Sequence, residues 1–242
     1  MRILIISDIH ANLFAFEAVL AAAAGKWDRI WCLGDVIGYG PHPNECVELL
    51  RQHNHISLSG NHDWAVLGKI DINIFNPEAQ KAIEWTHQQT TAETLDYLDQ
   101  LPSKLTFEPF TLAHASPRQP VWEYILDPYT AEINFDHFDT PYCLVGHTHV
   151  PVLFAYRDQF DVAALSPVYD ETVQLSNTRL IINPGSVGQP RDTDPRAAYA
   201  ILNLESLTWT HHRVVYPVEK TQEAMRKHDL PARLITRLAQ GW

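Results

Sequence analysis

The beginning of the chain alternates short apolar runs with segments of helical periodicity, and this alternation constrains the fold more than any other feature. The runs cover residues 2–7, 29–33 and 55–59, and the first is of the β-branched kind that forms a strand buried on both faces. Capping residues and apolar spacing predict helices over 12–24 and 43–53. A βαβαβ order of this kind predicts a parallel sheet with crossover helices.

The rest of the chain first adds helical patterns and then becomes mostly strand-like. Alternating apolar residues over 161–216 predict several strands, which we expect to form a second sheet. No linker, repeat or low-complexity tract interrupts the chain, so we expect one continuous domain over residues 1–242. The other predicted elements are helices over 77–88, 91–101, 218–227 and 232–239, a hairpin of 104–108 and 110–114, and strands over 141–146 and 152–157.

The charge balance argues against a surface that binds polyanions by bulk electrostatics. The chain has 18 Lys and Arg residues and 29 Asp and Glu residues, which gives a formal net charge of −11. Long nucleic acid and membranes are therefore not expected partners, and an anionic substrate must be captured locally.

The three cysteines show no C-x-x-C spacing, and no apolar run is long enough for a signal-peptide core or a membrane span. We expect a cytoplasmic protein with buried thiols.

Polar side chains follow the predicted strands at the points where these strands end. In an open α/β sheet, ligands bind beyond the carboxyl ends of the strands, so these side chains are expected to meet at one place. A set of Asp, His and Asn without a thiol suits manganese, iron or zinc better than calcium or a structural cysteine-zinc site. Any one of them alone is usually a cap or a turn, but their ordered combination makes coincidence negligible. The residues are Asp8, His10, Asp35, Asn61, His62, Asp63, His114, His147 and His149.

These motifs resemble the signature of the calcineurin-like metallophosphoesterase superfamily, which is D-x-H, G-D, G-N-H-[D/E], H and G-H-x-H. Every element occurs here in that order, at residues 8–10, 34–35, 60–63, 114 and 146–149. The segments SDIHAN, GDVIGYGPHP and NPGSVGQPRD are similar to those of small bacterial phosphoesterases. The resemblance implies an α/β fold in which two mixed β-sheets pack as a sandwich flanked by helices, in four layers, with a two-metal site at the sheet ends.

The resemblance also implies a division of the ligands between two divalent transition-metal ions. Manganese is the expected metal, with iron, zinc, nickel and cobalt as alternatives. Two dications held close together need a shared anionic ligand, which would be Asp35, and they acidify a bridging water until hydroxide is available at neutral pH. The implied ligands are Asp8, His10, Asp35 and His149 for the first ion, and Asp35, Asn61, His114 and His147 for the second.

His62 is not a ligand in the family pattern. The resemblance places it facing the leaving group, where its imidazolium form can protonate the departing alkoxide. Asp63 is expected to fix the tautomer of His62 and to raise its basicity. In the alternative interpretation, Asp63 caps a helix and His62 has no catalytic role.

Other polar and aromatic residues have two interpretations each. Asn12 could donate a hydrogen bond to a phosphate oxygen or act only as the N-cap of the first helix. Arg191 could clamp a phosphate bidentately or be a surface arginine on a turn. Trp122, Tyr124 and Tyr129 follow His114 in a proline-punctuated loop and could roof the site, although aromatic residues in such positions are more often part of the core.

The sequence thus predicts a metal-dependent phosphoesterase, either a phosphatase or a phosphodiesterase. A metal-bridging hydroxide would attack a phosphomonoester or phosphodiester of a small substrate, with His62 as general acid. One alternative is a non-catalytic metal-binding scaffold protein, although this chain keeps His62 and every ligand. The other is a nuclease of the same superfamily, which the acidic charge and the lack of a basic stripe disfavour. The identity of the substrate and the oligomeric state stay open.

Overall fold

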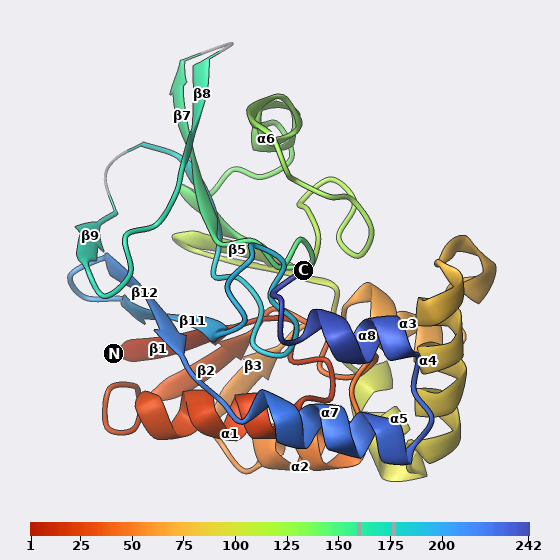
Figure 1. Ribbon diagram of the computed structural model, residues 1–242. Helices are drawn as coiled ribbons and strands as arrows, with labels where there is room; N and C mark the ends of the chain where they lie inside the picture. Colours follow the sequence, from red (N-terminus) through yellow and green to blue (C-terminus); the bar gives the residue numbers. More distant parts are fainter. Residues whose placement is uncertain (159–160, 176–177) are drawn as a thin grey trace.

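The computed structural model describes residues 1–158, 161–175 and 178–242, and it contains two mixed six-stranded sheets that face each other (Figure 1). The first sheet has the order β3-β2-β1-β11-β12-β9 and the second the order β4-β5-β6-β10-β7-β8. Strands of the first sheet are β1 (Arg2–Ile6), β2 (Arg29–Cys32), β3 (His55–Ser57), β9 (Thr172–Gln174), β11 (Ala197–Asn203) and β12 (Thr208–Val214). Strands of the second are β4 (Lys104–Phe107), β5 (Phe110–Ala113), β6 (Tyr142–Leu144), β7 (Val152–Asp158), β8 (Asp161–Leu165) and β10 (Leu180–Asn183).

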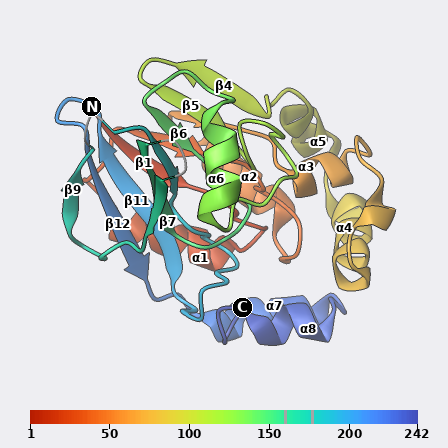
Figure 2. The ribbon, with the colours of Figure 1, turned by 90° about the horizontal axis from the view of Figure 1, so that it is seen from above.

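Helices cover the outer faces of the two sheets, which confirms the predicted fold class. α1 packs on β11 and β12 of the first sheet with α2 and α7 beside it, α4 packs on α3, and α6 lies beside β7 and β8 (Figures 1 and 2). The helices are α1 (Leu13–Ala22), α2 (Pro43–Arg51), α3 (Asn61–Val66), α4 (Pro77–Gln89), α5 (Ala92–Asp99), α6 (Pro128–Phe135), α7 (Val218–Lys227) and α8 (Ala232–Arg237). In the described part of the chain, no helix combines the length and the apolar character that crossing a membrane requires.

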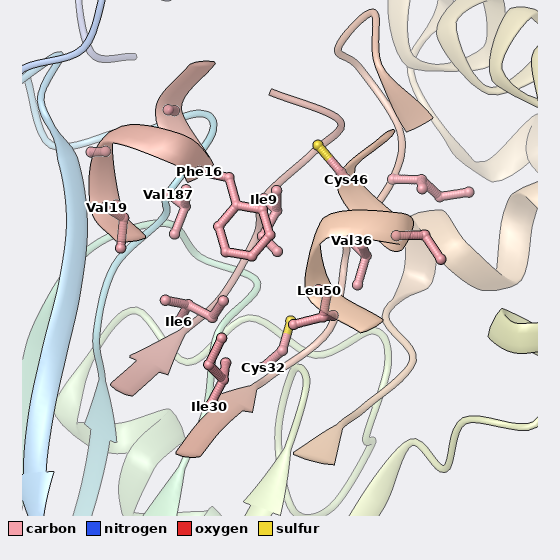
Figure 3. Close-up of a cluster of buried hydrophobic side chains, with 14 of the residues drawn as sticks. Ile6, Ile9, Phe16, Val19, Ile30, Cys32, Val36, Cys46, Leu50 and Val187 are labelled. Carbon is pink, nitrogen blue, oxygen red and sulfur yellow. The ribbon is translucent and has the colours of Figure 1, made fainter. Parts of the chain in front are cut away.

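β1 is the centre of the core because both of its faces are covered. Leu4 and Ile6 pack with α1 and α2, in a cluster that also contains Phe16 and Leu50 (Figure 3). Ile3 and Ile5 point the other way, into the layer between the two sheets. Successive side chains of a strand alternate between its faces, so an uninterrupted apolar run is what a strand buried on both sides requires. This buried strand fixes the position of the polar residues that follow it.

One topological prediction was wrong. The first three strands pair in parallel as expected, but residues 161–216 do not all enter a second sheet. Instead β11 pairs antiparallel with β1, for example Leu4 with Ile201, and β12 and β9 extend the same sheet. β11 is almost wholly buried, and a buried strand needs hydrogen-bonded neighbours on both sides, which β1 and β12 supply.

α6 was not predicted, although its sequence contains a start signal. The Asp127 carboxylate accepts a hydrogen bond from the Thr130 amide at 2.9 Å, and Pro128 occupies the first helical position. An Asp-Pro pair of this kind is a common way for a helix to begin. α6 packs against β7 and β8 and closes the outer face of the second sheet.

Candidate metal centre

The polar residues that follow the strands come together in one buried cluster. The loops after β1 and β2 are joined by hydrogen bonds from the Asp8 amide to the Gly34 carbonyl and from the His10 amide to the Asp35 carbonyl, each 3.0 Å long. The loop after β6 joins them because the His147 amide lies 3.2 and 3.1 Å from the two carboxylate oxygens of Asp8. These bonds hold side chains from three strands at one edge of the sheets.

The backbone of this cluster has an unusual conformation. Five of its polar residues have φ between 48° and 63°, in the left-handed region that residues other than glycine adopt rarely. Such a conformation costs of order 1–3 kcal/mol at each position, and it persists only where the surrounding structure enforces it. It lets each loop turn sharply after its strand so that the side chain points into the cluster. The five residues are Asp8, His10, Asp35, His147 and His149.

The first half of the cluster contains Asp8, His10 and His149. The His10 Nδ1–H donates to the Ile37 carbonyl and the His149 Nδ1–H to the Gln189 carbonyl, at 3.2 and 2.5 Å. In their neutral forms both rings therefore present an Nε2 lone pair to the centre, where the two Nε2 atoms lie 3.1 Å apart. The Asp8 carboxylate is 3.3 Å from the His149 Nε2. Lone pairs that face one another in this way are stabilised by a cation between them.

The second half of the cluster repeats this arrangement around Asp35, Asn61, His114 and His147. The His114 Nδ1–H donates to the Leu33 carbonyl at 2.9 Å, so its Nε2 faces Asn61 Oδ1 at 3.2 Å and Asp35 Oδ2 at 3.4 Å. Both Asp35 Oδ2 and His147 Nε2 are buried without a hydrogen-bond partner. Buried polar atoms are normally paired, so these two acceptors fit the ligand shell of a cation.

Asp35 belongs to both halves of the cluster. Its Oδ2 atom lies 3.6 Å from the His10 Nε2 and 3.4 Å from the His114 Nε2, while its Oδ1 accepts a hydrogen bond from the His62 amide at 2.8 Å. The structure thus brings together the residues that the sequence indicated as metal ligands, with Asn61 beside His114. The histidines and aspartates form three overlapping groups, which are Asp8, His10 and His149; His10, Asp35 and His62; and Asp35, His114 and His147.

The charges in the cluster are those of a cation site. Burial would raise the pKa of Asp8 and Asp35, but the neighbouring charges of His149 and His114 hold both values well below the usual range. Burial would also lower the pKa of His114, but the charge of the nearby Asp35 carboxylate raises that value to about 9. In the absence of another cation a proton on His114 thus compensates the Asp35 carboxylate, and a metal ion would replace that proton.

His62 lies at the edge of the cluster, as the second residue of α3. One of its ring nitrogens is within 4.8 Å of ligand atoms of His10 and Asp35, and its Nδ1 atom is buried without a hydrogen-bond partner. The ring packs against the rings of Tyr39 and Phe75, with centroids 4.2 and 5.2 Å away. These aromatic neighbours hold the imidazole in place, and its Nδ1 atom has no protein partner.

The predicted interaction between Asp63 and His62 is wrong. The Asp63 carboxylate accepts hydrogen bonds from the main-chain amides of Asp35, Ile37 and Gly60, at 2.9, 3.2 and 2.8 Å. Adjacent residues of a helix point in different directions, so Asp63 cannot reach the ring of His62. Asp63 instead caps α3 and positions the loop that carries Asp35, as the alternative interpretation stated.

Asn12 also acts structurally. Its Oδ1 accepts hydrogen bonds from the Ala15 amide at 3.3 Å and from the Thr221 hydroxyl at 2.9 Å, and its Nδ2 donates to the Gly188 carbonyl at 2.9 Å. The side chain is 1% exposed. The prediction that Asn12 binds a phosphate oxygen is therefore wrong, because the N-cap and the contact with α7 already use its amide.

Of the predicted residues outside the motifs, some border the cluster and one does not. Arg191 is half-buried, and its guanidinium carbon lies 6.0 Å from the ring centroid of Tyr39 beside the cluster. The ring of Tyr124 lies 4.0 Å from that of His147, and Trp122 is near it at 6.5 Å, so these two residues do border the site. Tyr129 is 72% exposed on α6. Tyr39 was not predicted as a site residue, although it belongs to the segment GDVIGYGPHP, which is similar to those of small bacterial phosphoesterases.

We predict that Gly60→Ala displaces Asp35. A Cβ atom at position 60 would lie 2.1 Å from Asp35 Oδ1 and 2.6 Å from the Asp35 amide nitrogen. We expect a lower metal content of the purified protein and an unfolding free energy lower by about 1–3 kcal/mol, measured by urea denaturation. The control is Gly25→Ala, which has open space and a φ of +72° and should cost stability without loss of metal. Equal metal content in the two variants would contradict the proposed packing.

Comparisons with known proteins agree with the motifs. A family model for the calcineurin-like phosphoesterase superfamily domain matches residues 1–207. The crystal structure of a metallophosphoesterase from Sphaerobacter thermophilus is 51% identical to this chain, with a TM-score of 0.92 over 100% of this chain and 99% of that one. Uncharacterized protein MJ0912 of Methanocaldococcus jannaschii is 38% identical over 245 residues, which are 99% of this chain and 98% of the relative. Protein PH1004 of Pyrococcus horikoshii, 18% identical, has the same fold with a TM-score of 0.81 over 100% and 98% of the two chains.

Proposed function

Because the chain belongs to the calcineurin-like phosphoesterase superfamily, we propose that its buried cluster is a two-metal centre that hydrolyses a phosphomonoester or phosphodiester of a small substrate. The observation that carries the proposal is the position of Asp35 between His10 and His114, with the Nε2 atoms of His10, His149 and His114 aimed inward. Family membership supports phosphoesterase chemistry, and the geometry of the cluster supports two ions rather than one.

The donor set selects the kind of metal. Imidazole, carboxylate and amide groups together suit manganese, with iron, zinc, nickel and cobalt as alternatives. When bound, two such ions lower the pKa of a coordinated water and neutralise charge on a phosphate. Asp8, His10, Asp35 and His149 would hold one ion, and Asp35, Asn61, His114 and His147 the other.

The chain's own residues orient these ligands and supply a proton. Main-chain carbonyls fix the tautomers of His10, His114 and His149, so the ligands need no reorganisation when metal binds. His62 stands beside His10 and Asp35, and its Nδ1 atom is buried without a hydrogen-bond partner. Burial lowers the pKa of its imidazole to about 4, and the charge of an incoming phosphate would favour its protonated form. A protonated His62 can then donate to the departing oxygen.

Metal removal tests this proposal. We expect protein treated with a chelator to lose all hydrolysis of phosphate esters and manganese to restore it, because the ligand cluster has no other means of activating water. Calcium alone should not restore activity, since histidine ligands suit it poorly. The assay is steady-state hydrolysis of a panel of phosphomonoesters, phosphodiesters and cyclic nucleotides before and after metal replacement.

Two outcomes of this assay would contradict the proposal. Full activity in a sample shown by elemental analysis to be free of metal would exclude metal-dependent hydrolysis. Stoichiometric manganese binding without hydrolysis of any member of the panel would instead favour a metal-binding scaffold.

A further inference from the structure

A cavity of about 330 Å³ lies beside the candidate metal centre. This volume is in the range of small-molecule sites, which is about 300–1,000 Å³. The charged and tyrosine side chains on its wall come from five parts of the chain. These parts are the loop after β2, α4, the loop before α6, the segment after β10, and α8. The residues are Tyr39, Glu78, Tyr124, Arg191, Arg233 and Arg237.

α8 contributes two arginines to this wall because of the way it packs. Leu234 and Leu238 are buried with Ala79 of α4, and α8 also packs on α7 (Figures 1 and 2). Arg233 and Arg237 are four residues apart, so they lie on the same side of the helix, one turn from each other. The apolar contacts of α8 thus direct both guanidinium groups toward the cavity.

Positively charged side chains outnumber acidic ones around the cavity. Glu78 is the one acidic side chain among the described lining residues, and its carboxylate is 4.0 Å from Arg233. Arg237 donates to the main-chain oxygen of Trp242, and Arg191 donates to the uncharged side-chain oxygen of Gln189. The Nε atom of Arg191 is buried without a hydrogen-bond partner. Burial and then the charge of Arg191 lower the pKa of Arg237 to about 10, as expected for guanidinium groups that repel each other.

The cavity adjoins the metal cluster through three of its wall residues. The Tyr39 ring contacts the rings of His10 and His62, with centroids 4.7 and 4.2 Å away. The Tyr124 ring contacts that of His147 at 4.0 Å, and the main-chain amide of Arg191 donates to the His149 carbonyl at 3.4 Å. These three residues therefore border both the cavity and the metal cluster.

We propose that this cavity binds a second phosphate group of the substrate, so that the molecule hydrolysed at the metal centre carries two phosphate groups. The inference rests on the proposed function and specifies its substrate class. Guanidinium groups bind phosphate oxygens in a bidentate geometry, and the unpartnered Nε of Arg191 supplies a donor that such a group would satisfy. In a chain with a net charge of −11, three arginines around one cavity with a single acidic side chain form a local anion site.

Calorimetric titration of the manganese-loaded protein tests the proposal without the need for turnover. The probes are propane-1,3-bisphosphonate and propylphosphonate, which share a carbon chain and whose C–P bonds are not phosphate esters. We expect the bisphosphonate to bind the wild-type protein at least about tenfold more tightly than propylphosphonate. In the Arg233→Gln/Arg237→Gln variant this preference should fall at least about fivefold, while propylphosphonate binding stays within about twofold of wild type.

The matched control is Arg226→Gln/Lys227→Gln, which removes the same charge from the exposed end of the neighbouring α7 and should keep the preference. Arg233→Lys/Arg237→Lys preserves the charge and should keep most of it. Equal preference in the Arg233→Gln/Arg237→Gln variant and in the control, or no preference in the wild type, would overturn the inference. A preference that depends on the arginines, in a protein that hydrolyses no phosphate ester, would instead overturn the proposed function alone.

Discussion

Asp35→Asn is expected to empty both metal positions at once. Asp35 Oδ2 lies 3.6 Å from the His10 Nε2 and 3.4 Å from the His114 Nε2, so it is the one carboxylate that belongs to both ligand groups. An amide at this position removes the negative charge that two neighbouring dications share. The metal affinity should fall by more than the 10–100-fold that is lost when a residue that only orients a ligand is replaced. Hydrolysis should be lost with it.

Elemental analysis after dialysis measures this effect as metal per chain. His147→Ala and Asn61→Ala should mainly empty the second position, because the His147 ring groups with Asp35 and His114, and Asn61 Oδ1 faces His114 Nε2 at 3.2 Å. Asp136→Asn makes the same chemical change at an exposed position and should leave the metal content unchanged. If Asp35→Asn retains both ions, Asp35 is not shared between them and the two-group model of the centre must be abandoned.

The ligand cluster could be predicted from sequence because strand ends are strong local signals. An apolar run such as Ile3–Ile6 must be buried on both faces, and the polar residues that follow it must then lie at the edge of a sheet. Sequence reasoning failed where the outcome depended on long-range packing. The alternation of β11 identified a strand but not its neighbour, and pairing with β1 is decided only when the whole sheet assembles.

The errors at individual residues have the same origin. The sequence around Asn12 was compatible with a helix cap and with a phosphate contact. The Thr221 hydroxyl that donates to the Asn12 Oδ1 atom belongs to a helix, 209 residues further along the chain. Asp63 is next to His62 in sequence, but the helix that begins at Asn61 turns the two side chains apart. Arg233 and Arg237 carry no motif at all, since only the packing of α8 on α7 and α4 brings them to the site.

His62→Ala is expected to reduce turnover in a way that depends on the leaving group. If His62 donates a proton to the departing oxygen, its loss should slow alkyl or sugar phosphates, whose leaving groups need that proton. General acid catalysis contributes about 10²–10⁴-fold, so kcat on these esters should fall by that factor. The nitrophenolate of a nitrophenyl ester leaves without protonation, so kcat on nitrophenyl esters should fall much less. Steady-state kinetics with a matched pair of alkyl and nitrophenyl phosphates measures the difference.

Two further variants separate a proton donor from a residue that supports the metal ligands. Asp63 accepts hydrogen bonds from the amides of Asp35, Ile37 and Gly60, so Asp63→Asn should disturb the ligand Asp35 and slow both esters alike, with loss of metal. His137→Ala removes an exposed histidine and should change neither rate.

A selective loss in His62→Ala with wild-type metal content therefore has one explanation, which is a missing proton at the leaving oxygen. The main-chain amide of His62, which donates to Asp35, remains in the alanine variant, so the support of the metal ligand by α3 is retained. An equal loss on both esters, or a loss that follows the metal content, would mean that the imidazole acts through its packing against His10 and Tyr39. In that case the proton would have to come from solvent, and His62 would be a positioning residue of the centre.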